Sequence, residues 1–283
     1  LYGSLVKQTY TNLEWVVVDD GSTDETKNVI TQIISEGKLD VRYSYQPNSG
    51  KHIAMNRGAQ MAKGHLFFVV DSDDYLTPNS VQTICMHWQN IITNPVSQNS
   101  KLIGIAANIM YPSGEVVGGK PSYTVMDTDL INYRFKSKIK GDKAEVYITE
   151  VVRQHPFPNI AGETFCPESI VFYRLADLGY KLRFINENLY VCDYLVGGLS
   201  LNGLKTIQRG PIASLQSYAD VIGFKQVPFI TRIKYSILFW RISHLDTKQS
   251  FMEQITMLPK KRYVLLYPFG LLFHLKDRLS GKI

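Results

Sequence analysis

Acidic side chains follow an apolar run in the first third of this sequence. Phe67-Phe68-Val69-Val70 leads directly into Asp71-Ser72-Asp73-Asp74. Carboxylates this close repel one another unless a cation lies among them. Hard cations such as Mg²⁺ or Mn²⁺ prefer oxygen ligands, so a metal could bridge these carboxylates to a phosphate. The alternative is an acidic turn that enters a helix, with Thr77 at the N-cap and Pro78 at N1.

A second apolar run upstream ends in the same way. Trp15–Val18 precedes Asp19 and Asp20, and Gly21 then permits a turn that other residues resist. One of residues 22–24 can cap a helix that begins near Glu25. In a parallel α/β sheet, ligands bind outside the carboxyl ends of the strands. Both acidic strand ends are therefore predicted to face one crevice, which favours a binding site.

Composition indicates a folded, non-secreted protein. Of 283 residues, 45% are hydrophobic and 20% charged, and the three cysteines are widely spaced. An odd, scattered set of cysteines fits neither a zinc site nor a disulfide framework, so we expect a reducing compartment and a cytoplasmic location. The sequence opens with no signal peptide and contains no apolar run of membrane-spanning length.

The net charge of +6 is unevenly distributed. Residues 231–283 contain ten Lys or Arg and three Asp or Glu, whereas residues 1–230 contain 21 and 22. The basic character therefore belongs to the C-terminal part alone. A nucleic-acid-binding protein should carry its basic surface on the main fold, so we expect no nucleic-acid partner.

Strand-like and helix-like segments alternate through the first half of the chain, which predicts an α/β fold with a mostly parallel sheet and flanking helices. Expected strands are Glu14–Val18, Val41–Tyr45, Leu66–Val70, Leu102–Ala107, Ile109–Tyr111 and Arg183–Tyr190. Expected helices are Glu25–Ser35, Ile53–Ala62, Pro78–Ile92, Thr149–Gln154 and Pro167–Leu178, with the end of a further helix at Leu5–Tyr10. Pro112-Ser113-Gly114 reads as a hairpin turn, and the chain is helical again beyond Leu201.

Three segments resemble glycosyltransferase family 2, whose members have the Rossmann-like GT-A fold. Val17–Asp24 is similar to the family's acidic nucleotide-binding turn, Asn48–Gly58 to its segment beneath the donor nucleotide, and Asp71-Ser72-Asp73 to its DxD motif. The resemblance covers about residues 1–200, which we expect to form the GT-A domain. Residues 201–283 are then a helical, basic extension.

The resemblance also implies roles for single residues. The implied donor-binding residues are Asp19, Asp20, Lys51, Asn56, Asp71 and Ser72, and the implied metal ligands are Asp73 and Asp71, for Mn²⁺ or Mg²⁺. An alternative for Lys51 is a solvated loop lysine. The family's catalytic base precedes a helix with a downstream arginine. Alignment on Arg174 places Glu168 in this role, with Glu163 as the competing candidate.

These assignments imply an inverting transfer of a sugar from a nucleotide-sugar donor, foremost a UDP-sugar, to a hydroxyl of a glycan or lipid-linked acceptor. A cation stabilises the departing diphosphate while one carboxylate takes the proton of the acceptor. The family normally begins with a strand before its first helix. Leu1–Leu5 already resembles that helix. We therefore expect a sheet that lacks a central member beside the nucleotide crevice.

The C-terminal segment combines basic clusters with apolar residues. Lys260–Arg262 and Lys276–Arg278 flank Tyr263–Leu275, and Ile230–Leu245 reads as another amphipathic helix. This pattern suits attachment to an anionic membrane surface, because thirteen residues are too short to span a bilayer. The alternative is a helical lid packed on the α/β body.

Three other functions remain open from the sequence. A HAD-like phosphatase also places DxD after a strand, but requires Thr or Val where Tyr75 stands. A nucleotidyltransferase should show a Gly-rich, Arg-containing loop near its start. A non-catalytic nucleotide-sugar-binding module would keep the donor residues without a base. The sequence does not predict the oligomeric state.

Overall fold

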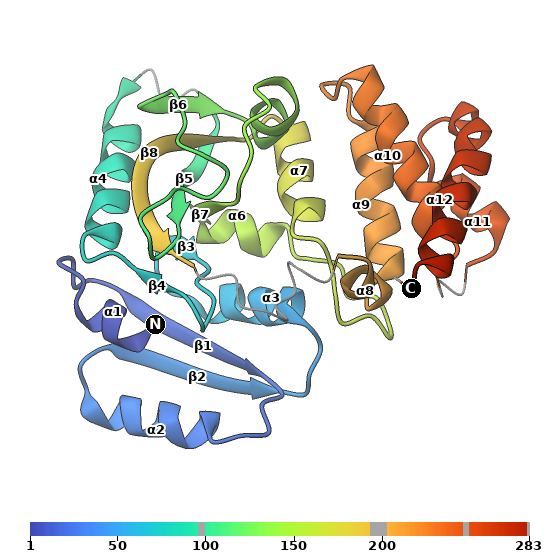
Figure 1. The fold of residues 1–283 in the computed structure, drawn as a ribbon. Coiled ribbons are helices and arrows are strands. Elements are labelled where there is room, and N and C mark those ends of the chain that lie inside the picture. Colours follow the sequence, from blue (N-terminus) through green and yellow to red (C-terminus); the bar gives the residue numbers. More distant parts are fainter. Residues whose placement is uncertain (96–99, 193–202, 246–248, 282–283) are drawn as a thin grey trace.

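The computed structural model describes residues 1–95, 100–192, 203–245 and 249–281 (Figure 1). The strands are β1 (Glu14–Asp20), β2 (Asp40–Gln46), β3 (Leu66–Phe68), β4 (Tyr75–Leu76), β5 (Leu102–Met110), β6 (Val125–Thr128), β7 (Lys143–Ile148) and β8 (Lys181–Val191). The helices are α1 (Tyr2–Val6), α2 (Thr26–Glu36), α3 (Lys51–Met61), α4 (Ser80–Thr93), η1 (Asn132–Lys136), α6 (Thr149–Gln154), α7 (Ser169–Asp177), α8 (Gly203–Gln208), α9 (Pro211–Gly223), α10 (Phe229–Ile242), α11 (Phe251–Met257), η3 (Lys261–Leu266) and α12 (Tyr267–Leu279).

Two sheets form the α/β body. Strands β1 and β2 pair in parallel, and the larger sheet has the order β3-β7-β5-β8-β4, with β6 beside β8. Strands β3, β5 and β8 run in one direction, because β7 is antiparallel to β3 and β5 while β8 is parallel to β5. Strands β4, β6 and β7 run the opposite way. The predicted α/β class is confirmed.

The strand ladder is interrupted between β1 and β3. Within the described ranges, β1 pairs only with β2, and β3 only with β7. Helix α3 crosses this interruption, since a methyl group at Gly58 would touch both Val18 of β1 and Phe67 of β3. The Glu14 carboxylate adds a second connection, because it accepts hydrogen bonds of 2.6 Å from the backbone N–H groups of Lys63 and Gly64.

Helices cover both faces of the larger sheet (Figure 1). On one face, Ile84, Trp88 and Ile91 of α4 repeat at helical spacing and pack with Ile105 of β5. On the other face, α7 packs against Tyr147 of β7, whose ring stacks on Phe172 with centroids 4.5 Å apart. Strand β5 is buried between these layers, as its largely apolar composition favours, with Asn108 as its buried polar residue.

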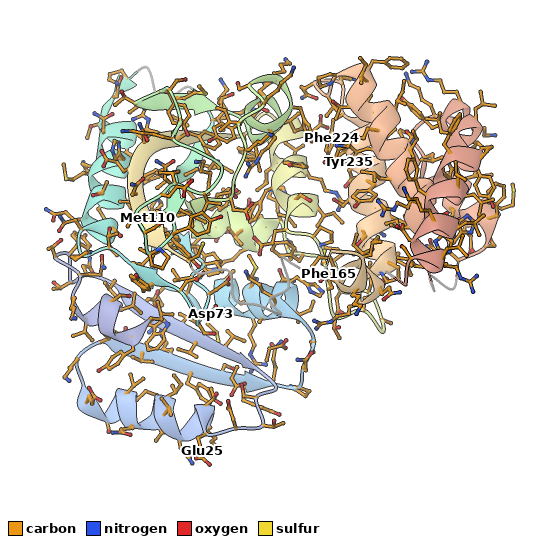
Figure 2. The ribbon with its side chains drawn as sticks, viewed as in Figure 1. Glu25, Asp73, Met110, Phe165, Phe224 and Tyr235 are labelled. Atoms are coloured by element: carbon orange, nitrogen blue, oxygen red, sulfur yellow. The ribbon has the colours of Figure 1, made fainter. Side chains whose placement is uncertain are left out.

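The helices from α9 onward form a second layer beside α7. Phe224 and Val227 extend the core of the body towards α9 and α10, and Figure 2 shows Phe224 and Tyr235 at this junction. Phe239 and Trp240 of α10 are fully buried in a separate cluster shared with α9, α11 and η3. The expected helix at 230–245 is therefore present as α10. Residues 201–202, within the segment predicted to turn helical, lie outside the described ranges.

Several local predictions were wrong. Strand β3 ends at Phe68 because its partner β7 pairs no further than Val146, and α1 ends at Val6. Helix α4 begins at Ser80, since Tyr75–Leu76 is drawn into a pair with β8, so Thr77 and Pro78 are not its cap. The expected strands at 102–107 and 109–111 are one strand, β5. Strands β6 and β7 were not predicted.

Candidate active site

The Asp20 carboxylate joins three segments at the carboxyl end of β1. One of its oxygens accepts hydrogen bonds from Gln46 Nε2 and the Ser49 N–H, and the other accepts from the Gly50 N–H, each at 2.8 Å. The end of β1 is thereby tied to the end of β2 and to the loop that starts α3. Asp20 lies where the sequence predicts, but its oxygens hold the protein's own loops.

Asp19 beside it is also satisfied internally. Its buried carboxylate accepts a hydrogen bond from the Ser22 N–H at 2.8 Å and another from the Tyr43 hydroxyl at 2.7 Å. Burial alone would raise the pKa of Asp19, but these hydrogen bonds lower it below its usual value. The same bond raises the pKa of Tyr43 to about 12. Asp19 therefore remains ionised and shapes the turn.

Two glycines let the loops approach closely. Gly21 has φ +89°, and a Cβ there would lie 2.7 Å from the backbone nitrogen of Asn48. Gly50 has φ +93°, and a Cβ there would lie 2.2 Å from the carbonyl oxygen of Thr164. Only glycine fits either place. The second approach brings the 163–168 segment against the start of α3.

Lys51 connects the two ends of the predicted site. Its ammonium lies 2.7 Å from Asp71 and 3.1 Å from Glu168. Burial alone would lower the pKa of Lys51, but the charges of Glu168 and Asp71 raise it above its ordinary value. All three side chains remain more than 40% exposed, so they stay accessible to a ligand and the pairs add little stability.

The side chains of the DxD turn differ in their exposure to solvent. Ser72 and Asp73 are exposed, and Asp73 lies at the junction between the β1–β2 layer and the larger sheet (Figure 2). Asp74 is buried and accepts a hydrogen bond of 2.6 Å from the Tyr190 hydroxyl. That hydroxyl in turn accepts from the Asp71 N–H at 3.0 Å. Tyr190 of β8 thus fixes the turn.

Glu163 and Asn56 are engaged elsewhere. The Glu163 carboxylate accepts hydrogen bonds from the Ile212 and Ala213 N–H groups, at 2.6 and 3.0 Å, and so caps α9. Asn56 exchanges two hydrogen bonds with the backbone of Phe157, at 2.8 and 2.9 Å. Both side chains position loops, and the structure does not bring them into the Lys51 cluster.

The residues present fit a hard divalent cation only in part. In the described parts of the chain, no three His, Cys, Asp or Glu side chains converge as a metal site. Asp71 and Asp73 nevertheless supply carboxylate oxygens two residues apart. Mg²⁺ commonly takes one or two carboxylates and completes its shell with phosphate oxygens and water. The donor set therefore suits a cation that arrives with a diphosphate.

Tyr190, Tyr43 and Gln46 are the site residues that the sequence did not reveal. None belongs to an acidic motif, and each acts through a hydrogen bond to a carboxylate from a different strand. Burial raises the pKa of Tyr190, so its hydroxyl stays protonated and can donate to Asp74. Their one sequence signal is a polar or phenolic group near the end of a predicted strand.

Comparison with known proteins agrees with this geometry. Residues 1–130 match the family model described as Glycosyl transferase family 2. Streptococcus pneumoniae glycosyltransferase GlyG is 29% identical over 66% of this chain and 63% of its own length. Pasteurella multocida hyaluronan synthase is 39% identical over 29% of this chain and 8% of its own. The chain thus matches less than two thirds of either relative.

Solved structures share the fold. S. aureus TarS 1–349 aligns with 99% of this chain and 87% of its own, with a TM-score of 0.63 at 16% identity. Its complex with UDP gives a TM-score of 0.57 at 17% identity, with the same coverage. The chain therefore has a fold of the GT-A type. The match to glycosyltransferase family 2 covers residues 1–130, a little under half of the chain.

Glu163→Gln should test the capping role of this side chain. The amide keeps the shape but loses the charge that favours the N-terminus of α9, so we expect a loss of about 1 kcal/mol in the free energy of unfolding. Urea denaturation measures it. Glu187→Gln, on an exposed position of β8, is the control and should change stability by less than about 0.5 kcal/mol. Equal stability of the two variants would contradict the cap.

Proposed function

We propose that the protein is an inverting glycosyltransferase. It moves a sugar from a nucleoside diphosphate donor, foremost a UDP-sugar, to a hydroxyl of a glycan or lipid-linked acceptor, with Mn²⁺ or Mg²⁺. The observation that carries the proposal is the contact of Lys51 with both Asp71 and Glu168, which joins the DxD turn to a carboxylate at the start of α7. S. aureus TarS has been solved with UDP and with UDP-GlcNAc, which supports a UDP-sugar here.

Glu168 is the base that this geometry favours. It is about half exposed and makes one ion pair, whereas both oxygens of Glu163 are used to cap α9. Glu168 takes the proton of the acceptor hydroxyl as that oxygen forms a bond to the anomeric carbon. The bond from this carbon to the diphosphate breaks, and its electron pair leaves on the phosphate oxygen. One displacement gives inversion.

Lys51 has two states in this mechanism. Without donor its ammonium pairs with Glu168 at 3.1 Å and occupies a carboxylate oxygen that the acceptor would need. The donor diphosphate competes for the same ammonium, so binding of the donor releases Glu168 to accept a proton. A bound divalent cation, held by Asp73 and Asp71, supplies further stabilisation of the leaving diphosphate. Ser72 lies between these ligands and is free to contact the phosphates.

The C-terminal helices support a membrane-surface partner. Along α12 the buried face contains Gly270, His274 and Asp277, and Asp277 pairs with Arg241 at 2.6 Å. The outward face is apolar, with Leu272 64% and Leu279 91% exposed. This inverts the usual arrangement of a helix packed on a globular body. Exposed apolar side chains here and in η3 are Leu265, Phe269, Leu272, Phe273, Leu275 and Leu279, beside the basic Lys260, Lys261, Arg262, Lys276 and Arg278.

We therefore propose peripheral attachment of α12 to an anionic lipid surface, with the apolar side chains in the headgroup region. No helix in the described part of the chain has the length and hydrophobicity needed to cross a bilayer. The three cysteines are unpaired by disulfides, which supports the cytoplasmic face. The GT-A domain at 1–200 and the helical extension at 201–283 then act as a catalytic and an attaching part.

Binding of UDP should depend on the DxD turn. Isothermal titration with UDP is expected to show binding in Mn²⁺ that falls at least tenfold in EDTA or in Asp73→Ala, because a ligand of the cation is lost. Asp177→Ala, at the end of α7, is the control and should bind as the unchanged protein does. Metal-independent binding that survives Asp73→Ala would remove the cation from the proposal.

Glu168→Gln separates an enzyme from a binding module. The amide cannot accept the proton of the acceptor, so transfer from a UDP-sugar should fall by 10²–10⁴-fold while UDP affinity is kept. Release of UDP measures the rate, including slow hydrolysis of the donor by water. Glu163→Gln is the matched control and should retain the rate. A normal rate in Glu168→Gln with loss in Glu163→Gln would assign the base to Glu163.

Vesicle co-sedimentation tests the attachment. Phe269→Glu with Leu272→Glu places charge on the apolar face, so binding to vesicles of phosphatidylserine and phosphatidylcholine should fall at least tenfold. Met86→Glu changes an equally exposed apolar residue on α4 and should bind normally. Binding of the unchanged protein should also weaken in high salt. Equal binding of both variants would contradict a membrane role for α12.

A further inference from the structure

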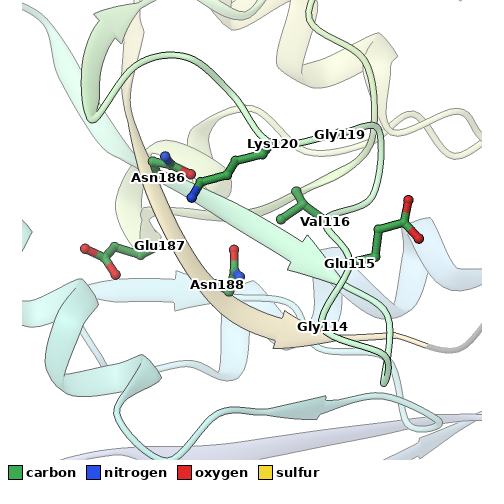
Figure 3. A pocket seen from close by; sticks show the side chains of 8 residues that line it. All are labelled: Gly114, Glu115, Val116, Gly119, Lys120, Asn186, Glu187 and Asn188. Atoms are coloured by element: carbon green, nitrogen blue, oxygen red, sulfur yellow. The ribbon is translucent and has the colours of Figure 1, made fainter.

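A second polar pocket lies beside β8, apart from the Lys51 cluster. The loop 114–120 folds back over β8 and leaves a cavity of about 640 Å³ (Figure 3). This volume lies within the range of about 300–1,000 Å³ typical of ligand sites. Figure 3 shows the Lys120 side chain reaching towards Asn186 and Asn188, while Glu115 and Glu187 lie at its rim. The mechanism above uses none of these residues.

A buried lysine sets the orientation of the amides in this pocket. Lys143 of β7 is 7% exposed and donates a hydrogen bond of 2.8 Å to Asn108 Oδ1. An ammonium can only donate, so the Asn108 carbonyl must face it and the Asn108 Nδ2 must face β8. That Nδ2 donates to the Oδ1 atoms of Asn186 and Asn188, at 2.9 and 3.1 Å. Both of these amides therefore turn their N–H groups away from Asn108.

The Nδ2 groups of Asn186 and Asn188 make no hydrogen bond to another described residue. The Oδ1 atoms of Asn186 and Asn188 can both reach Asn108 because the register between β5 and β8 shifts here. Ala106 lies opposite Phe184, whereas Asn108 lies opposite Asn188, so β8 carries two extra residues at this point. Bulges of this kind redirect side chains next to functional sites. The result is a pair of oriented donors for which the described part of the chain provides no acceptor.

Stability alone does not account for this arrangement. Burial, and the nearby charge of Arg134, lower the pKa of Lys143 to about 8, so the protein carries the cost of a desolvated ammonium whose hydrogen-bond partner is an amide. An apolar residue of similar size would remove that cost. A hydrogen-bond donor at position 143 fixes the direction of the Asn108 amide, and through it the directions of the Asn186 and Asn188 amides.

Two connections link the pocket to the proposed active site. Tyr190, two residues beyond Asn188, binds the DxD turn through Asp71 and Asp74. Lys143 and Glu145 lie on one face of β7, and the charge of Glu168 helps to raise the pKa of the half-buried Glu145 to about 7, although desolvation is the main cause. A ligand in the pocket would thus be connected through the sheet both to the DxD turn, where the diphosphate would bind, and to Glu168, the proposed base.

We propose that this pocket is an acceptor subsite that binds a sugar unit through its oxygens, with Asn186, Asn188 and Lys120 as donors. Lys143 and Asn108 are positioning residues. The proposal rests on the glycosyl transfer proposed above, since it assigns the second substrate. A hydroxyl group both accepts and donates hydrogen bonds, so donors on the floor and the carboxylates of Glu115 and Glu187 at the rim complement a polyhydroxylated ring.

Saturation-transfer NMR with small probes tests the subsite. The probes are N-acetylglucosamine, galactose, glucuronic acid and glycerol 3-phosphate at millimolar concentration, which separate neutral from anionic units. At least one should bind, and Asn186→Ala with Asn188→Ala should weaken it at least fivefold. Asn28→Ala, on the exposed surface of α2, should bind normally. No binding of any probe, or equal binding by the double variant, would overturn the proposal.

The UDP titration separates this test from the proposed function. Loss of UDP binding by the unchanged protein would contradict the transferase, whatever the sugar probes show. The Asn186 and Asn188 variant should keep UDP affinity within twofold, since neither residue touches the Lys51 cluster. A parallel loss of UDP and probe binding would instead indicate a damaged fold and refute a separate subsite.

Lys143→Met distinguishes positioning from support of the fold. Methionine fills a similar volume but frees the Asn108 amide to rotate, so probe affinity should fall as in the double variant. The thermal midpoint should stay equal or rise, because a buried charge is removed. A lower midpoint with unchanged probe affinity would overturn the positioning role.

Discussion

The carboxylate of Asp20 is the constraint on which the donor side of this protein depends. It accepts hydrogen bonds from Gln46, Ser49 and Gly50, and so joins the end of β2 and the loop before α3 to the end of β1. Hydrogen bonds to a charged acceptor contribute about 1.5–3 kcal/mol each, so this small group outweighs the exposed ion pairs around it. By holding Gly50 it sets where α3 begins, and Lys51 is the first residue of that helix.

The position of Gly50 also affects where Glu168 lies. Gly50 abuts the carbonyl of Thr164, and Gly210 abuts that of Phe165, so the 163–168 segment is held between α3 and α9. Glu163 fixes the segment to α9, and Glu168 then reaches Lys51. The two acids that are indistinguishable in sequence thus have different environments. Glu163 binds the N-terminus of α9 and so holds the loop that leads to Glu168.

Local patterns revealed the acidic strand ends, because a buried strand followed by carboxylates is visible within ten residues. The prediction of α2, α3, α7 and β8 succeeded for the same reason. Strand β7 was missed, although its Lys143, Glu145 and Tyr147 alternate with apolar residues as in a half-buried strand. Lys143 binds Asn108 of β5 and Tyr147 stacks on Phe172 of α7, and nothing near these residues in the sequence predicts either contact.

Interruption of the sheet changes how the acidic clusters are held relative to each other. A continuous ladder would fix Asp20 and Asp71 through backbone hydrogen bonds, but the described strands provide none between β1 and β3. Helix α3 takes that role instead, since it packs on both strands at Gly58 and begins at the lysine that pairs with Asp71. The Glu14 carboxylate holds the far end, where it binds the Lys63 and Gly64 backbone and pairs with Arg42. Movement of α3 would therefore carry Lys51 together with the loops that Asp20 holds at the ends of β1 and β2.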